Sequence, residues 1–143
     1  GNTNSYQLQK YLEIVKMVEH RTTLTHLRTG CTYLAIDMGR FKNIPKQNRI
    51  CPLCKQGVED LEHFLFQCQK KTEARIRLED TLNSIKNHKF KQQCLNDKQK
   101  IIMNLHFQNP SLIQKISKVI FDIYKERTKW EKSNKNSSQD NET

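Results

Sequence analysis

The spacing of cysteine and histidine near the middle of the chain constrains its fold more than any other feature. Cys51, Cys54, His63 and Cys68 follow the pattern C-x2-C-x8-H-x4-C. Three thiolates and one imidazole complete the tetrahedral shell of a Zn²⁺ ion and leave no ligand position for water. The spacing therefore predicts a closed structural zinc site, a zinc knuckle over residues 49–69, rather than a catalytic metal.

Two alternatives to zinc stay open for these cysteines. They could be reduced thiols buried in a small helical core, or two of them could form a disulfide. The chain has five cysteines, an odd number, and neither a secretory leader nor a long apolar run. These features favour a reducing compartment, the nucleus and/or the cytoplasm, and no membrane association. We expect Cys31 and Cys94 to be free thiols outside the site.

The size of the chain limits how much core it can build. It has 143 residues, of which 35% are hydrophobic. This length supports one small domain, which we place at residues 1–132, and a bound zinc ion would compensate for a modest core. The remaining residues, 133–143, are rich in Asn, Ser and Lys and predict a disordered tail.

Helical periodicity before the knuckle predicts an all-α fold. An amphipathic helix is expected over residues 5–20. A second short helix would carry Leu24 and Leu27, begin at Thr22 or Thr23, and end at Gly30 in a left-handed C-cap. A third would contain residues 33–38 and stop at Gly39.

The pattern after the knuckle is also helical. Asp60 is expected to cap the turn that carries His63, with Phe64 and Phe66 packed beside the metal. An apolar stripe at Ala74, Leu78, Leu82 and Ile85 predicts a helix ending near Asn87. Asp97 is a candidate cap for a further helix, and Asn109-Pro110 reads as the start of a long last helix reaching Trp130.

The charge of the chain indicates a polyanionic partner. The formal net charge is +10. Residues 1–50 carry eight basic and three acidic side chains, whereas residues 51–70 carry two basic and three acidic ones. The knuckle is therefore not the cationic surface, and flanking segments would supply phosphate contacts. The basic segment 86–100, with Phe90 among its lysines, is either such a surface or a loop.

Several segments together resemble a known family. They are Arg21-Thr-Thr-Leu-Thr-His-Leu-Arg28-Thr-Gly30, Gly39-Arg40, Arg49-Ile-Cys51-Pro-Leu-Cys54 and Val58-Glu-Asp-Leu-Glu-His63-Phe-Leu-Phe-Gln-Cys68. Over residues 21–78 this resembles the zinc-binding C-terminal region of non-LTR retrotransposon reverse transcriptase polyproteins. The resemblance implies that Cys51, Cys54, His63 and Cys68 are zinc ligands and that the region engages RNA or DNA. The polymerase and nuclease parts of such polyproteins are absent from this chain.

Two functions follow from these observations. The first is a zinc-stapled nucleic-acid-binding module for RNA and/or DNA that contacts phosphates through basic side chains: Arg21, Arg28, Arg40, Lys42, Lys46, Arg49, Arg75 and Arg77. The alternative is a protein-interaction or oligomerisation module that uses the apolar helix over residues 110–130.

An enzyme is not expected. The proposed metal shell has no open position, and the other histidines are scattered along the chain. Glu59, Asp60 and Glu62 are close in sequence, but helix capping and solvation account for them better than acid–base chemistry does.

Overall fold

The computed structural model describes residues 13–86, 89, 91–92 and 110–142, with no account of the side chains beyond Asn134. Its helical elements are α2 (Val18–Thr29), α3 (Ala35–Phe41), η1 (Lys46–Asn48), η2 (His63–Gln67), α4 (Glu73–Asn83) and α7 (Pro110–Glu142). Within these residues the only strand-like pairing is an isolated antiparallel bridge between Ile50 and Val58. The predicted all-α class is confirmed.

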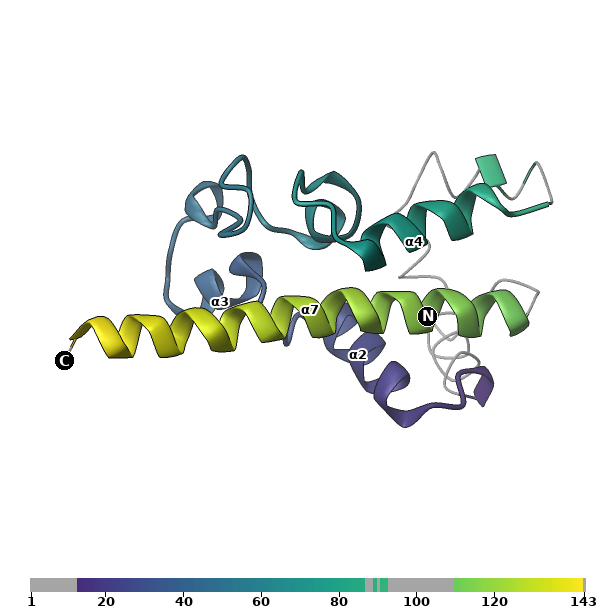
Figure 1. Ribbon diagram of the computed structural model, residues 1–143, viewed down its shortest axis with the longest axis horizontal. Coiled ribbons are helices and arrows are strands. Elements are labelled where there is room, and N and C mark those ends of the chain that lie inside the picture. The colour runs from purple at the N-terminus through teal and green to yellow at the C-terminus, as the bar shows by residue number, and fades with distance from the viewer. Residues whose placement is uncertain (1–12, 87–88, 90, 93–109, 143) are drawn as a thin grey trace.

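The long helix α7 organises the molecule. It runs the length of the fold, with α2 and α4 beside its N-terminal half and α3 and the cysteine-rich loop towards its C-terminal half (Figure 1). Both α2 and α4 pack directly against α7. None of the described helices combines the length and apolarity that a membrane span requires.

An apolar core joins these helices. On α7 the buried side chains recur at helical spacing and meet Leu24 and Leu27 of α2 and Leu78 of α4. The buried residues of α7 are Ile113, Ile116, Val119, Ile120 and Ile123. The apolar face on which the protein-interaction alternative rests is thus largely covered within the chain itself.

The beginning of the described chain differs from the prediction. Residues 13–14 are helical, 15–17 are not, and α2 begins at Val18. The predicted helix over residues 5–20 is therefore interrupted, and Thr22 and Thr23 lie inside α2 rather than capping it. Val15, within the interruption, is buried in the core. Gly30 does end α2 in the predicted left-handed conformation, at φ 73°.

Gly39 does not stop the next helix, because α3 continues to Phe41. Its role is close packing instead. A Cβ atom at Gly39 would lie 2.4 Å from Cγ of Arg49, so only glycine allows this approach. The turn after α3 is made at Asn43, whose φ is 57°, a left-handed conformation that Asn tolerates better than most residues.

The helix α4 carries the predicted stripe but has different ends. Ala74, Leu78 and Leu82 are buried, and Ile85 packs against the same core from just beyond the helix. The helix ends at Asn83, before the expected Asn87, and the Oγ1 of Thr72 caps its start by accepting the Arg75 N–H. Phe90, Cys94, Asp97, most of the basic segment 86–100 and Asn109 lie outside the described residues.

The C-terminal end of α7 overlaps the segment that the sequence predicts to be a disordered tail. The helical backbone continues to Glu142, through most of the segment 133–143 that the sequence assigns to a tail. Arg127, Trp130, Glu131 and Asn134 of α7 line a cleft. Disorder of residues 133–143 stays a prediction of the sequence.

Candidate metal centre

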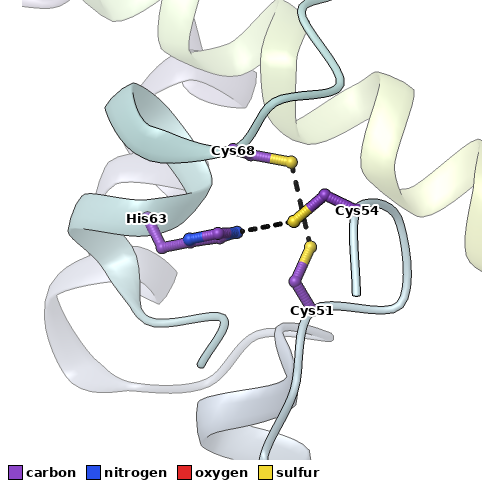
Figure 2. Close-up of side chains that lie close together, drawn as sticks. All are labelled: Cys51, Cys54, His63 and Cys68. Carbon is purple, nitrogen blue, oxygen red and sulfur yellow. Dashed lines mark hydrogen bonds between the residues drawn. The ribbon is translucent and has the colours of Figure 1, made fainter. Parts of the chain in front are cut away.

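Cys51, Cys54, His63 and Cys68 converge on one point. Each offers one ligand atom, and the four atoms lie within 4.8 Å of one another. Figure 2 shows the two sulfurs of the loop facing the His63 imidazole and the Cys68 sulfur. Cys51, His63 and Cys68 are buried and Cys54 is partly buried. The group that the sequence predicted is therefore assembled, and it could hold a metal ion.

The first two cysteines are positioned by a tight loop. The bridge between Ile50 and Val58 closes its base, and the Cys51 N–H donates to the Gly57 carbonyl at 2.7 Å. The Lys55 N–H donates back to the Cys51 carbonyl at 2.9 Å, with Lys55 at φ 59°. This turn places the Cys51 and Cys54 sulfurs on its inner side, where a cation could bridge them.

A π-helical turn positions the other two residues. In an α-helix, residues five apart point about 140° away from each other around the axis. Here the Cys68 N–H donates to the His63 carbonyl at 2.8 Å, an i to i+5 bond that widens η2 into a π turn. Asp60 holds its start, because Oδ1 accepts the His63 N–H at 2.8 Å. The predicted cap at Asp60 is confirmed, and the π turn explains how x4 spacing brings His63 and Cys68 together.

Two of the distances within the cluster match the ligand separations of a tetrahedral Zn²⁺ site. With Zn–S bonds of about 2.3 Å, two sulfurs of one shell lie about 3.8 Å apart. The Cys51 and Cys68 sulfurs are 3.9 Å apart. The Cys54 sulfur and Nε2 of His63 are 3.3 Å apart. Thiolate and imidazole donors are ligands of Zn²⁺ and other soft or borderline metal ions, whereas Ca²⁺ and Mg²⁺ prefer oxygen.

The two loop cysteines differ in acidity. Burial raises the pKa of the Cys51 thiol to about 12, although backbone hydrogen bonds from Cys54 and Leu53 oppose it. Burial acts the same way on Cys54, but hydrogen bonds from the Gln56 backbone and from the neighbouring thiols outweigh it and lower the pKa of that thiol. Cys54 is thus the readier thiolate, and a bound cation would favour ionisation of both.

Glu59 links the cluster to two other parts of the fold. Its side chain is fully buried. Oε2 lies 3.9 Å from the Cys51 sulfur and accepts from Nε of Arg127 at 2.8 Å. Oε1 accepts from Nη2 of Arg127 at 3.0 Å and from the Ala35 N–H at 2.7 Å. One carboxylate therefore ties the metal loop to the start of α3 and to α7.

Sequence reasoning missed this contact. It placed Glu59 among solvated or capping carboxylates, whereas only Asp60 acts as a cap. Glu59 and Arg127 are 68 residues apart in the chain, and nothing in local periodicity signals a pair at that separation. The one usable hint is Arg127 itself, which falls in register with the apolar residues Ile116, Ile120 and Ile123 on the core side of α7.

The predicted phosphate-binding residues divide into two groups. Arg40, Lys42 and Lys46 are exposed on α3, the following turn and η1. Arg40 also donates to the Gly30 carbonyl at 2.7 Å and lies 3.5 Å from Asp37. Arg21 and Arg28 are partly buried on α2. Arg77 is exposed on α4 and pairs with Asp122 at 3.3 Å.

Two further arginines make hydrogen bonds to backbone carbonyls of the fold. Arg75 is only 4% exposed, and its guanidinium donates to the backbone carbonyls of Phe64 and Lys70. It is therefore buried away from a phosphate ligand, a correction to the sequence-based assignment. Arg49 donates through Nε to Ile44 and through Nη1 to Ile36, both at 2.9 Å, and so holds the chain around α3.

Phe64 and Phe66 contribute to the apolar core, and their predicted packing beside the metal stays a prediction. Phe64 is fully buried in the core, with the Arg75 guanidinium over its ring at 5.5 Å from the centroid. Phe66 is partly buried against the same core. Phe64 therefore fixes the π turn that carries two ligands, and it is not accessible for stacking on a base.

Comparison with known proteins adds no relative to this picture. A scan against protein-family models, a search of curated proteins and a search of solved structures each find no match to the chain.

Proposed function

We propose that this protein is a zinc-stapled module that binds nucleic acid through the exposed basic segment 40–48. The zinc assignment is supported by three sulfurs and one imidazole nitrogen that lie within 4.8 Å of one another, two pairs of them at 3.9 Å and 3.3 Å. The shell is closed, so the ion stabilises structure and has no position for a substrate or an activated water. The proposed role is therefore binding and not catalysis.

One observation carries the choice of partner. Every residue from Arg40 to Asn48 is exposed, and Arg40, Lys42 and Lys46 lie there without an acidic residue between Gly39 and Ile50. Phe41 among them is 65% exposed. Exposed cations that alternate with an exposed aromatic ring suit a strand of phosphates and bases.

The metal loop and α7 would give this segment its shape. The segment is anchored before and after by Asp37 and Arg49 and leads directly into Cys51. Arg21 and Arg28 of α2 and Arg77 of α4 would add charge at a distance. The resemblance to the C-terminal region of non-LTR retrotransposon polyproteins, whose segments include Cys51, Cys54, His63 and Cys68, is consistent with this proposal.

The alternative function is contact with a protein partner or self-association through residues 110–130. The apolar residues of this helix that face α2 and α4 are buried, so a partner would have to use the remaining surface. We therefore favour nucleic acid.

The test is binding of the zinc-loaded protein to labelled single-stranded RNA, single-stranded DNA and duplex DNA, followed by fluorescence anisotropy over a salt series. We expect affinity to fall steeply with salt, and the double substitution Lys42→Gln/Lys46→Gln to reduce the slope of log K against log salt by about 1.5. Lys115→Gln/Lys132→Gln removes the same charge from exposed positions of α7 and is the matched control. Binding that is independent of salt, or equal loss in both variants, would contradict the proposal.

A further inference from the structure

A cleft lies between α3 with its following turn and the C-terminal part of α7, and nothing in the metal site explains it. Its volume is ≈ 350 Å³. Its lining includes Tyr33, just before α3, Trp130 on α7, and Asn48 and Asn134. The Asn134 amide nitrogen donates to the Trp130 carbonyl at 2.9 Å, which leaves its Oδ1 as an acceptor for a ligand. Lys42 and Arg49 bring positive charge.

The charges around the cleft leave it cationic. Arg127 also lines it, but its guanidinium is shared between Glu59 and Glu131, with Nη1 2.7 Å from the Glu131 carboxylate. Lys42 is exposed and belongs to no ion pair that the structure shows among the described residues. The Arg49 hydrogen bonds go to neutral carbonyls, so its charge is not neutralised. The cleft therefore favours an anionic ligand.

The aromatic residues add a preference for a planar ligand. Tyr33 is 42% exposed, and its fold contacts are made by its backbone, through the N–H to Tyr124 and the carbonyl to Arg127. The ring is thus available to a ligand. One side of the Trp130 indole is covered by the Arg127 guanidinium, 5.1 Å from the ring centroid, which holds the indole in place at the cleft wall.

Resting on the nucleic-acid function proposed above, we infer that this cleft holds one unpaired nucleotide of a single strand. Tyr33 and Trp130 would contact the base, Lys42 and Arg49 the phosphate, and the amides of Asn48 and Asn134 the base edge. The volume lies at the small end of ligand sites, about 300–1,000 Å³, and suits one base rather than a stacked pair. An acidic peptide would satisfy the cations but would leave the aromatic walls and the amides without a matching group.

The chain contains a built-in reporter for this inference. Trp130 is its only tryptophan, so tryptophan emission, excited at the red edge of the absorption band where tyrosine absorbs little, reports on the cleft. Titrating the full zinc-loaded protein with an unlabelled single strand should quench Trp130 along the same curve that anisotropy gives for a labelled one. A blunt duplex should leave the emission unchanged. Single-stranded RNA and DNA of one sequence, compared in parallel, identify which strand the cleft prefers.

Two substitutions separate stacking from charge. Tyr33→Ala should weaken single-strand binding about 5- to 150-fold, the range expected for one base-stacking contact, whereas Tyr33→Phe should bind like the parent. Lys42→Gln should lessen the salt dependence, and Lys115→Gln, the matched change far from the cleft, should not alter the quenching. Retained zinc content and melting temperature show that each variant is folded.

The outcomes distinguish the cleft from the wider function. Single-strand binding by anisotropy without a change in Trp130 emission, or with Tyr33→Ala unaffected, overturns the nucleotide cleft and leaves the proposed function standing. No binding to any nucleic acid overturns both. Quenching by poly-glutamate at least as strong as quenching by oligonucleotide would replace the nucleotide with an acidic peptide.

Discussion

The two ends of α7 sit in different chemical surroundings. We call α2, α4 and α7 residues 110–124 the helical half, because buried apolar side chains pack these segments together. We call residues 31–68 and α7 residues 127–134 the metal half, because a Cys and His cluster and hydrogen-bonded polar groups connect these segments. Leu34, Phe64 and Leu65 join the two. The comparison teaches that one long helix packs against an apolar core at one end and beside a cluster that could hold a metal ion at the other, so we expect only the second end to depend on an ion.

The buried polar residues make the contrast concrete. In the metal half Asp37, Glu59 and Arg127 are all buried, and each has a hydrogen-bonded partner. A complete buried ion pair adds little net stability to a protein, whereas loss of one partner leaves a buried charge uncompensated and destabilises the fold strongly. We therefore expect the metal half to depend on its ion and its geometry, and the helical half on apolar area.

Of the changes considered, removing one of the proposed metal ligands should destabilise the protein most. Cys68→Ser deletes a sulfur from the cluster, and because metal-binding energy is folding energy in such a site, the metal half should lose its order. Native mass spectrometry should find one zinc ion per parent chain and none in the variant. Cys31→Ser, an exposed cysteine outside the cluster, is the control. A Cys68→Ser protein with full zinc content would refute the ligand set.

Breaking the buried ion pair between Glu59 and Arg127 should have the second-largest effect on stability. Arg127→Leu leaves the Glu59 carboxylate buried without its cation, which should lower the free energy of unfolding by about 3–5 kcal/mol. Urea denaturation of the zinc-loaded protein measures it. Arg77→Leu is the matched control, since its pair with Asp122 is partly exposed and should contribute under about 1 kcal/mol. Equal losses in the two variants would show that Glu59 does not couple the metal loop to α7.

A cavity in the helical half should lower the free energy of unfolding and leave the zinc content unchanged. Ile116 is fully buried, so Ile116→Ala should lower the free energy of unfolding by about 2–5 kcal/mol. Zinc content at low temperature should be unchanged, because the ligands come from the other half. Loss of zinc from the folded Ile116→Ala protein would mean that the two halves are not separable as described.

A helix cap should give the smallest change. Thr72→Ala removes the side-chain acceptor at the start of α4 and should cost about 1 kcal/mol. Thermal melting against Thr72→Ser, which keeps an acceptor, measures the difference. A serine variant as unstable as the alanine variant would show that the hydroxyl does not act as a cap.

The sequence predicted the two halves unequally. Local patterns were sufficient for the cluster and for the stripes on α4 and α7, because ligand spacing and helical periodicity are short-range properties. Arg75, Arg49 and Glu59 show the limit. Each is a charged residue that the sequence assigns to the surface. Arg75 and Glu59 are buried and Arg49 is partly buried, and each is held by partners that only the folded chain brings near. Gly39 marks the same limit, since its role depends on the side chain of Arg49.

The most direct measurement is hydrogen exchange on the full chain, with and without bound zinc, read by mass spectrometry peptide by peptide. The account predicts that removing the ion with a chelator abolishes protection over residues 31–68 and weakens it over 127–134, while α2, α4 and residues 110–124 keep most of theirs. Unchanged protection over 31–68 after complete metal removal would contradict the claim that this half is stapled by an ion.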